Sequence, residues 1–375
     1  MLKLEKYGVE LKPYLAVFWR TKRFNRFIDR IAFKYFSFWK IFFTIGVFLA
    51  IGELLFTLKF FASNLMASYY GGNAQLVLPL IPGVTISFSS LPYFVISVVV
   101  VFCLHEFAHG IAARVEGIRL KSIGMMFVVL IFGGFAELVD EDISRAKITS
   151  KLRLLAAGSM ANLLCGIIIT VFIINFSLVI SPLFSGPEGV LIVSVVDGSP
   201  ADRAGIVVGD VILSINGSRI TDTYSFVKYM YSAPANSTLV LSLLRGNIIV
   251  HSSFHPLNSS IAFLGVRSFN YYAPRFLTAI LTPMSAWHIY NVFTWLELLS
   301  VSAALINMLP IPFFDGGGFF EALFQFPIFK RRTVYFLNRK MTVGEALLNI
   351  IRLTSIMLLF ANISQSFILG GFRMP

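Results

Sequence analysis

Apolar residues gather in five long runs, and several of these runs are flanked by short segments rich in lysine and arginine. The runs cover residues 41–63, 91–113, 152–180, 276–309 and 346–369. A membrane-spanning helix needs about 20 mostly apolar residues, so each run is long enough to cross a bilayer. The fourth run exceeds one span and has room for either a tilted helix with a surface helix or a helical hairpin. The pattern predicts five or six spans.

Two segments break this pattern. Residues 123–138 are apolar but too short to span, so they form either a re-entrant segment or a pair of core strands. Residues 186–266 alternate short apolar runs with turn residues, which is typical of strands together with one or two helices. The predicted fold class is therefore a polytopic α-helical membrane protein with a short membrane-embedded β element and one small α/β domain.

The same pattern divides the chain into four regions. A basic N-terminal arm occupies residues 1–40, and a first membrane part follows at residues 41–181. The small α/β domain takes residues 186–266, and a second membrane part takes residues 275–375.

Composition and charge agree with a membrane protein. Hydrophobic residues make up 57% of the chain and charged residues 13%, whereas soluble domains carry about 25% charged residues. There are 31 Lys and Arg against 19 Asp and Glu, a net charge of +12. Because these cations cluster at the ends of apolar runs, as cytosolic loops do, the charge indicates a membrane topology and we expect no nucleic-acid partner.

The same cations predict an orientation. The N-terminal arm is basic, whereas residues 64–91 carry no charge. The positive-inside rule places the N-terminus in the cytosol and residues 64–91 outside. Continuing the alternation places the small domain outside the cytosol as well. In a prokaryote, the membrane that the protein spans would be the cell membrane.

The second apolar run contains the motif His105-Glu106-Phe107-Ala108-His109. Residues four apart share one face of a helix, so both imidazoles can bind one metal ion. Zinc suits two imidazoles and one carboxylate and leaves a fourth position for water. Glu106 stands beside the first imidazole, where it can act as a base in amide hydrolysis. Polar groups inside a span are costly unless they pair or bind a ligand, which argues against a purely structural trio.

A third ligand must come from elsewhere in the chain. Acidic candidates in or near the spans are Glu53, Glu137, Glu297, Glu321 and Asp315. Asp315 is favoured because Pro310 and Pro312 break the helix just before it, and such a break persists in a membrane only where it lines a cavity or site. The two glycines that follow Asp315 allow the backbone to approach closely.

Together, HExxH in one span and Asn-x-x-Pro-x-Pro-x-x-Asp-Gly in a later one resemble the site-2 protease family of intramembrane zinc metalloproteases. The resemblance covers about residues 90–320. It implies that His105, His109 and Asp315 hold one zinc ion per chain and that Glu106 is the catalytic base. It also implies that Asn307 holds the substrate backbone or the developing oxyanion.

Other segments fit the same family. Residues 156–162 are similar to its small-residue core helix, although Ser159 stands where the family commonly has proline. Gly133 and Gly134 resemble part of its membrane-embedded β element, whose edge pairs with an unwound substrate strand. In the small domain, Gly198-Ser199-Pro200-Ala201 and Gly209-Asp210-Val211-Ile212 resemble a PDZ domain. That resemblance implies a peptide ligand.

The expected function is an intramembrane zinc endopeptidase that cleaves a membrane-anchored protein within or near its transmembrane helix. Its expected partners are that substrate, the lipid bilayer and a peptide bound by the PDZ-like domain. Two other functions remain open: a non-catalytic membrane-anchored PDZ scaffold or receptor, and a metal transporter that uses the same ligands.

Overall fold

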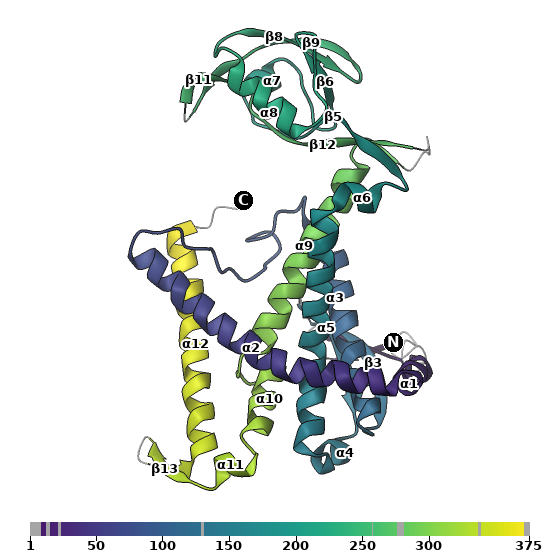
Figure 1. The fold of residues 1–375 in the computed structure, drawn as a ribbon, viewed down its shortest axis with the longest axis vertical. Coiled ribbons are helices and arrows are strands. Elements are labelled where there is room, and N and C mark those ends of the chain that lie inside the picture. The colour runs from purple at the N-terminus through teal and green to yellow at the C-terminus, as the bar shows by residue number, and fades with distance from the viewer. Residues whose placement is uncertain are drawn as a thin grey trace. The chain divides into compact units, whose positions relative to one another are not determined.

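The computed structural model describes residues 9–12, 16–21, 24–128, 131–256, 258–275, 281–336 and 339–370. Five of the described helices are long and apolar enough to cross a membrane. They are α2 (Phe36–Tyr69), α3 (Leu91–Val115), α5 (Ile148–Ile174), α9 (Ser285–Asn307) and α12 (Val343–Gly370) (Figure 1). Over its described residues the fourth apolar run forms the single helix α9, and residues 276–280 of that run lie outside the described residues. The polytopic helical fold is confirmed.

The chain divides into two compact units. The membrane unit comprises residues 1–169 and 295–375, and the insert unit comprises residues 170–294. Within the membrane unit, α2 crosses the other spans obliquely, from α1 (Asn25–Lys34) at one end toward α12 at the other (Figure 1). α2 has 34 residues and begins before the apolar run predicted for it, because Phe36 and Phe38 already continue the helix.

Helix α1 lies within the N-terminal region that the sequence assigns to a basic arm. Its Ile28 and Ala32 are fully buried in a cluster with Ala112 of α3. Next to Ile28, Asp29 pairs with Arg114 of α3. The helix is amphipathic, and it packs against the C-terminal part of α3, the second span.

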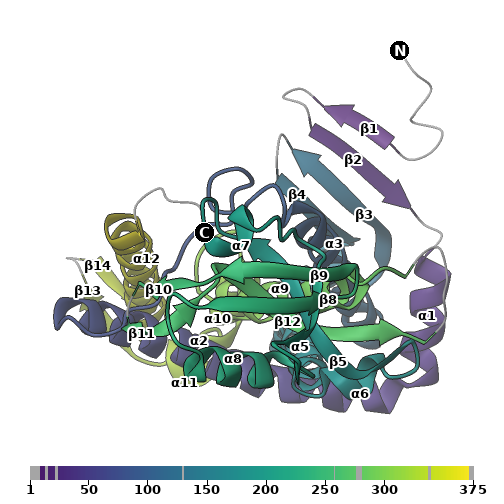
Figure 2. The same ribbon diagram turned by 90° about the horizontal axis from the view of Figure 1, so that it is seen from above.

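The predicted β element is a strand pair. β3 (Leu120–Val128) and β4 (Ile131–Leu138) pair antiparallel. Two strands from the N-terminal region, β1 (Val9–Lys12) and β2 (Ala16–Thr21), extend them into a sheet of order β1-β2-β3-β4 (Figure 2). Residues 1–8, 13–15 and 22–23 of the predicted arm, and residues 129–130 between β3 and β4, lie outside the described residues. β4 forms one edge of the sheet.

Short elements complete the membrane unit. They are α4 (Asp140–Arg145), α10 (Asp315–Leu323), α11 (Pro327–Lys330), and the paired strands β13 (Thr333–Phe336) and β14 (Arg339–Thr342). α10 packs through Phe319 and Phe320 into the apolar cluster formed by α2, α5 and the end of α9. This packing seats the start of α10 beside the spans.

A buried polar contact joins α2 to α12. The Asn64 side-chain amide donates to Asn362 Oδ1 at 2.9 Å and to the Gln75 carbonyl at 2.8 Å. Its own Oδ1 accepts from the Gln75 backbone N–H at 2.7 Å. These bonds satisfy two asparagines inside the apolar region and hold the segment after α2 against both helices.

The insert unit is a small α/β domain built on a six-stranded sheet. The main strand order is β12-β5-β6-β8-β9, with β7 paired to β6, and the strands of this sheet pair antiparallel. The strands are β5 (Phe184–Val195), β6 (Val211–Ile215), β7 (Ser218–Arg219), β8 (Thr238–Leu243), β9 (Gly246–His251) and β12 (Val266–Pro274). A separate pair is β10 (Ser253–His255) with β11 (Asn258–Phe263). The helices are α6 (Phe176–Ile180), α7 (Pro200–Arg203) and α8 (Thr223–Ser232).

Local chemistry explains two features of this domain. Asn216 and Gly217 both have positive φ, 47° and 81°, as the tight turn between β6 and β7 requires. Asp222 caps α8 by accepting from the Ser225 backbone N–H at 2.7 Å, and Ser225 Oγ accepts in return from the Asp222 N–H at 3.1 Å. The domain core is formed by inward-facing aliphatic residues such as Ile192, Ile212 and Leu241.

Candidate active site

Helix α3 places His105 and His109 one turn apart on the same face. Their Nε2 atoms lie 3.1 Å from each other. Both side chains are buried, with 5% and 8% of their surface exposed. Glu106 lies between them in sequence and is half-buried in the wall of the same cavity.

Asp315 reaches the two imidazoles from the break after α9. That helix ends at Asn307, and after Pro310 and Pro312 the chain re-enters a helix at Asp315, the first residue of α10. Asp315 Oδ2 lies 3.0 Å from His105 Nε2 and 3.1 Å from His109 Nε2. The structure therefore brings together the three side chains that the sequence predicts as ligands.

This donor set fits a zinc ion. Two imidazole nitrogens and one carboxylate oxygen are a common catalytic zinc environment. Tetrahedral zinc with bonds of about 2.0–2.1 Å holds its ligand atoms about 3.3 Å apart. The three atoms here lie only slightly closer, and among the described residues they form the one group of His, Cys, Asp and Glu positioned to hold a metal ion.

Neighbouring groups orient both rings. His109 Nδ1 lies 2.9 Å from the Leu154 carbonyl of α5. A carbonyl only accepts, so Nδ1 carries the proton and leaves His109 Nε2 bare for a metal. His105 Nδ1 lies 3.1 Å from the Asn162 amide nitrogen, and Asn162 Oδ1 has no partner among the described residues. A half-turn of this carboxamide lets Oδ1 accept from His105 Nδ1–H, so His105 Nε2 is free in the same way.

Asn162 is a site residue that motif reasoning does not single out. The available signal was an asparagine in the middle of an apolar run, where an amide side chain is costly unless it bonds to something. Gly158, one turn earlier on α5, is a second site residue that the motifs do not single out. A Cβ at Gly158 would lie 2.3 Å from His105 Cε1, so only glycine leaves room for this ring.

The glycines after Asp315 have the predicted use. A Cβ on Gly316 would lie 2.4 Å from the Met308 carbonyl, and one on Gly317 would lie 2.5 Å from the Ile311 carbonyl. The start of α10 therefore packs directly on the preceding backbone, which fixes the position of Asp315.

Asn307 completes the inner group of side chains. It is the last residue of α9, and its Nδ2 lies 3.1 Å from His105 Nε2 and 3.3 Å from Asp315 Oδ2. All five residues predicted for the site, His105, Glu106, His109, Asn307 and Asp315, line one cavity of about 490 Å³.

Sequence comparison matches residues 93–351 to peptidase family M50. The chain belongs to peptidase family M50. The membership predicted from its two motifs in the site-2 protease family is thereby confirmed.

Three relatives have sequences similar to this M50 chain. An uncharacterized protein of Methanocaldococcus jannaschii is 28% identical over 287 residues, 76% of this chain and 67% of that protein. A membrane-bound transcription factor site-2 protease homolog of Arabidopsis thaliana is 27% identical over 54% of this chain, which spans only 39% of that protein. A candidate zinc metalloprotease of Clostridium perfringens is 24% identical over 69% of this chain and 90% of that protein.

One solved structure is similar to part of the M50 chain. The PDZ domain of the SdrC-like protein from Listeria monocytogenes matches 22% of this chain and 90% of that domain, with 20% identity and a TM-score of 0.21. Family and relatives together support a membrane metalloprotease.

The other acidic candidates of the M50 chain lie outside the cluster of His105, His109 and Asp315. Glu137 accepts from Ser122 Oγ at 2.9 Å, and Glu321 accepts from Arg352 at 2.8 Å. Glu53 is buried in α2, and its carboxylate has no hydrogen-bond partner among the described residues. Glu297 lies on α9 two turns and more before Asn307. Asp315 alone of the five candidates joins the histidines.

An ion pair joins Glu116, the residue after α3, to Arg153 in the second turn of α5. Arg153 donates to the Glu116 carboxylate through Nε at 2.6 Å and through Nη2 at 3.0 Å. Burial raises the pKa of Glu116, but hydrogen bonds from Arg153 and Ser150 outweigh it and hold that pKa below its ordinary value. The pair therefore favours the ionised carboxylate at neutral pH.

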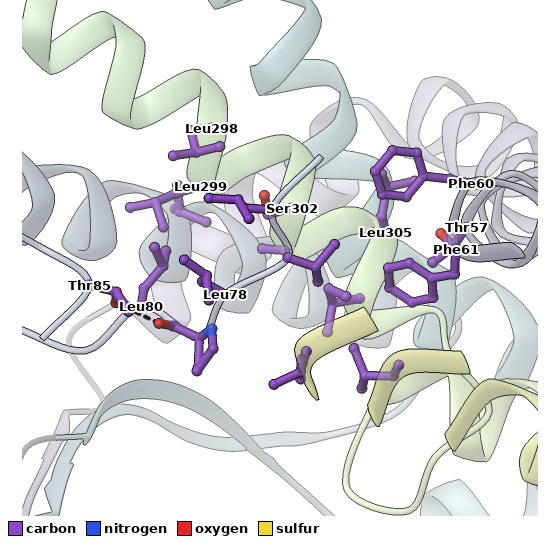
Figure 3. A pocket seen from close by; sticks show the side chains of 18 of the residues that line it. Thr57, Phe60, Phe61, Leu78, Leu80, Thr85, Leu298, Leu299, Ser302 and Leu305 are labelled. Atoms are coloured by element: carbon purple, nitrogen blue, oxygen red, sulfur yellow. Dashed lines mark hydrogen bonds between the residues drawn. The ribbon is translucent and has the colours of Figure 1, made fainter. Parts of the chain in front are cut away.

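A second, larger cavity of the M50 chain differs in chemistry. Its volume is about 780 Å³, and α2, α3, α9, α12 and the segment after α2 line it (Figure 3). All its lining side chains are uncharged, and most are Phe, Leu, Ile or Val. Phe102 lines both this cavity and the one that contains His105, His109 and Asp315. Among the lining residues that the structure describes there is no Asp, Glu, His, Cys, Lys or Arg.

Proposed function

We propose that the protein is an intramembrane zinc endopeptidase that cleaves membrane-anchored proteins within or near their transmembrane helices. The single observation that carries this proposal is the convergence of His105, His109 and Asp315, whose donor atoms lie 3.0–3.1 Å apart, in one cavity with Glu106. Membership of peptidase family M50 and a relative named as a zinc metalloprotease candidate support zinc as the metal and peptide hydrolysis as the reaction.

Each side chain has a role that follows from its position. His105, His109 and Asp315 would hold a zinc ion, which would supply Lewis-acid activation of water and of the scissile carbonyl. Glu106 is the general base that accepts a proton from the attacking water and then delivers it to the leaving amine. Asn307 points its amide N–H groups toward the same centre, where they stabilise negative charge that develops on the carbonyl oxygen.

The substrate must expose its peptide bond before it can react. Backbone groups of a transmembrane helix are hydrogen-bonded to each other, so the helix has to unwind locally. Strand β4 lies at the edge of its sheet and contains Gly133 and Gly134. We expect it to pair with the unwound segment as an added strand.

The distribution of basic residues supports an orientation. His105 and His109 lie near the end of α3, and Asn307 ends α9. Arg114 lies in the last turn of α3, and Arg119 and Lys121 follow the helix closely. The positive-inside rule therefore places the N-terminus and the mouth of the catalytic cavity on the cytosolic side and the insert domain outside, where its PDZ-like motifs would bind a peptide.

The decisive experiment replaces Glu106 with Gln. Purified protein in detergent is incubated with a tagged single-span reporter, and fragments are followed by immunoblotting. We expect cleavage to fall by about 10²–10⁴-fold, the usual contribution of a general base, while bound zinc is retained. Glu188→Gln, an exposed carboxylate on β5, is the control and should cleave normally. Unchanged cleavage by the Glu106 variant would refute the proposal.

A further inference from the structure

The loop between α9 and α10 contains a strained turn. The Phe314 backbone N–H donates to the Ile311 carbonyl at 3.2 Å, which closes a four-residue turn with Pro312 in second position. Phe313, in third position, has φ +78°. A turn with proline second and positive φ third is a type II turn, and its third position favours glycine because a Cβ is disfavoured there. A bulky aromatic residue occupies this position instead.

The Phe313 ring receives no compensation from packing. Its relative exposure is 105%, the highest among the large hydrophobic side chains described as exposed. The backbone beneath it is firmly held, because the close packing of Gly317 on Ile311 fixes one side and Arg352 donates to the Pro310 carbonyl at 3.0 Å on the other. The backbone of the turn is therefore fixed by its contacts, whereas the Phe313 ring is exposed and packs against no other side chain that the structure describes.

Phe313 also lines the catalytic cavity. It does so together with His105, Glu106 and Asp315, and it stands two residues before Asp315 in the chain. Strained backbone positions that persist without a packing benefit cluster at active sites and ligand clamps. A ring at the edge of a cavity lined by Glu106, Lys151 and Asp315 has polar neighbours there, which distinguishes it from the apolar side chains that only face lipid.

We infer that Phe313 is a specificity residue whose ring contacts an apolar side chain of the substrate next to the scissile bond. This inference rests on the proposed function and names a contact within it. Transmembrane substrates supply apolar side chains on both sides of the cut. Binding such a side chain against the ring buries both surfaces, so the contact favours Leu, Ile or Phe over a polar residue at that substrate position.

Two variants separate the ring from the strain. Phe313→Gly removes both, whereas Phe313→Ala removes the ring and keeps the positive φ. Both should retain zinc, and Phe313→Gly should melt at or above the wild-type temperature because glycine suits the turn. Each should cleave a single-span reporter with Leu beside the cut about ten- to a hundredfold less efficiently in kcat/KM, the effect of losing one aromatic contact.

The preference of the enzyme gives the sharper readout. A reporter series carrying Leu, Ile, Phe, Asn or Ser at each position beside the cut is compared for wild type and both variants. We expect the wild-type preference for apolar residues at one position to disappear in both variants, while Phe88→Ala, an exposed phenylalanine outside both cavities, behaves as wild type. Unchanged kcat/KM and preference in both variants would overturn the inference.

Photocrosslinking tests the contact itself. Benzoylphenylalanine replaces Phe313 in the Glu106→Gln background and is irradiated with the Leu reporter in nanodiscs. Adducts should form with substrate residues flanking the cut, and the same probe at Phe88 should form none. Adducts with lipid alone would show a membrane anchor and overturn the inference. Failure of wild type to cut any reporter would count against the proposed function, whereas cutting that ignores Phe313 counts only against this contact.

Discussion

The two cavities of the membrane unit differ in how their polar side chains are hydrogen-bonded. In the apolar cavity, the Thr57 hydroxyl donates to the Glu53 carbonyl at 2.7 Å and the Thr85 hydroxyl to the Pro79 carbonyl at 2.6 Å. Both hydroxyls are therefore satisfied by nearby backbone. In the smaller cavity, His105, His109 and Asp315 are turned toward one another.

The difference shows what marks a reactive site inside an apolar protein. The apolar cavity is the larger of the two, about 780 Å³ against about 490 Å³. Size therefore does not identify the site. The smaller cavity is distinguished by two imidazole rings that Leu154 and Asn162 contact at Nδ1, so that both Nε2 atoms face the cavity.

Removal of the Asp315 carboxylate should have the largest effect on the difference between the two cavities. Asp315→Ala should weaken zinc binding by more than about a hundredfold, because even residues that only orient ligands are worth ten- to a hundredfold. Bound zinc is measured by mass spectrometry of the purified protein. Glu321→Ala removes a carboxylate from the same cavity that pairs with Arg352 instead, and it should retain zinc. Equal zinc in the two variants would remove Asp315 from the ligand set.

Filling the space beside His105 comes next. Gly158→Ala should displace the imidazole, since the added Cβ would lie 2.3 Å from the ring, and a shift of about 1 Å can cost about a hundredfold in rate. Reporter cleavage and zinc content measure the effect. Gly52→Ala on α2 is the matched control, because a Cβ there meets no atom within 4 Å. Wild-type cleavage by Gly158→Ala would show that the ring position is not critical.

Removing the partner of His105 should have a smaller effect. Asn162→Leu leaves His105 Nδ1 without its amide neighbour and should reduce zinc affinity by about ten- to a hundredfold. Competition with a chelator measures that affinity. Asn291→Leu is the control, because Asn291 donates only within its own helix, to the Trp287 carbonyl. If both variants bind zinc alike, Asn162 contributes packing rather than orientation.

The smallest expected effect concerns the ion pair between Glu116 and Arg153. The Glu116 pKa is lowered in the folded protein, so the pair with Arg153 contributes stability above about pH 4.5 that is lost as pH falls through the folded pKa. Glu116→Gln should lower the free energy of unfolding by about 1–2 kcal/mol at neutral pH and by less in acid. Denaturation in detergent at several pH values, with Arg153→Met and the double variant, measures the coupling. A constant difference across pH would contradict this assignment.

Local patterns in the sequence already determine much of this protein. Run length sets the five spans, because a bilayer demands about 20 apolar residues from any helix that crosses it. The spacing of His105 and His109 places them on one face, and the prolines before Asp315 end α9 where the site needs a break. Turn chemistry likewise predicts the tight turn at Asn216 and Gly217.

Contacts between distant segments decided the remainder. The addition of β1 and β2 to the sheet depends on strands about a hundred residues later, so no local periodicity reveals it. The use of Gly158 and Asn162 is visible only when α5 lies against α3. Close packing and hydrogen bonding act over a few ångströms in space, whereas sequence patterns record only neighbours along one helix or strand.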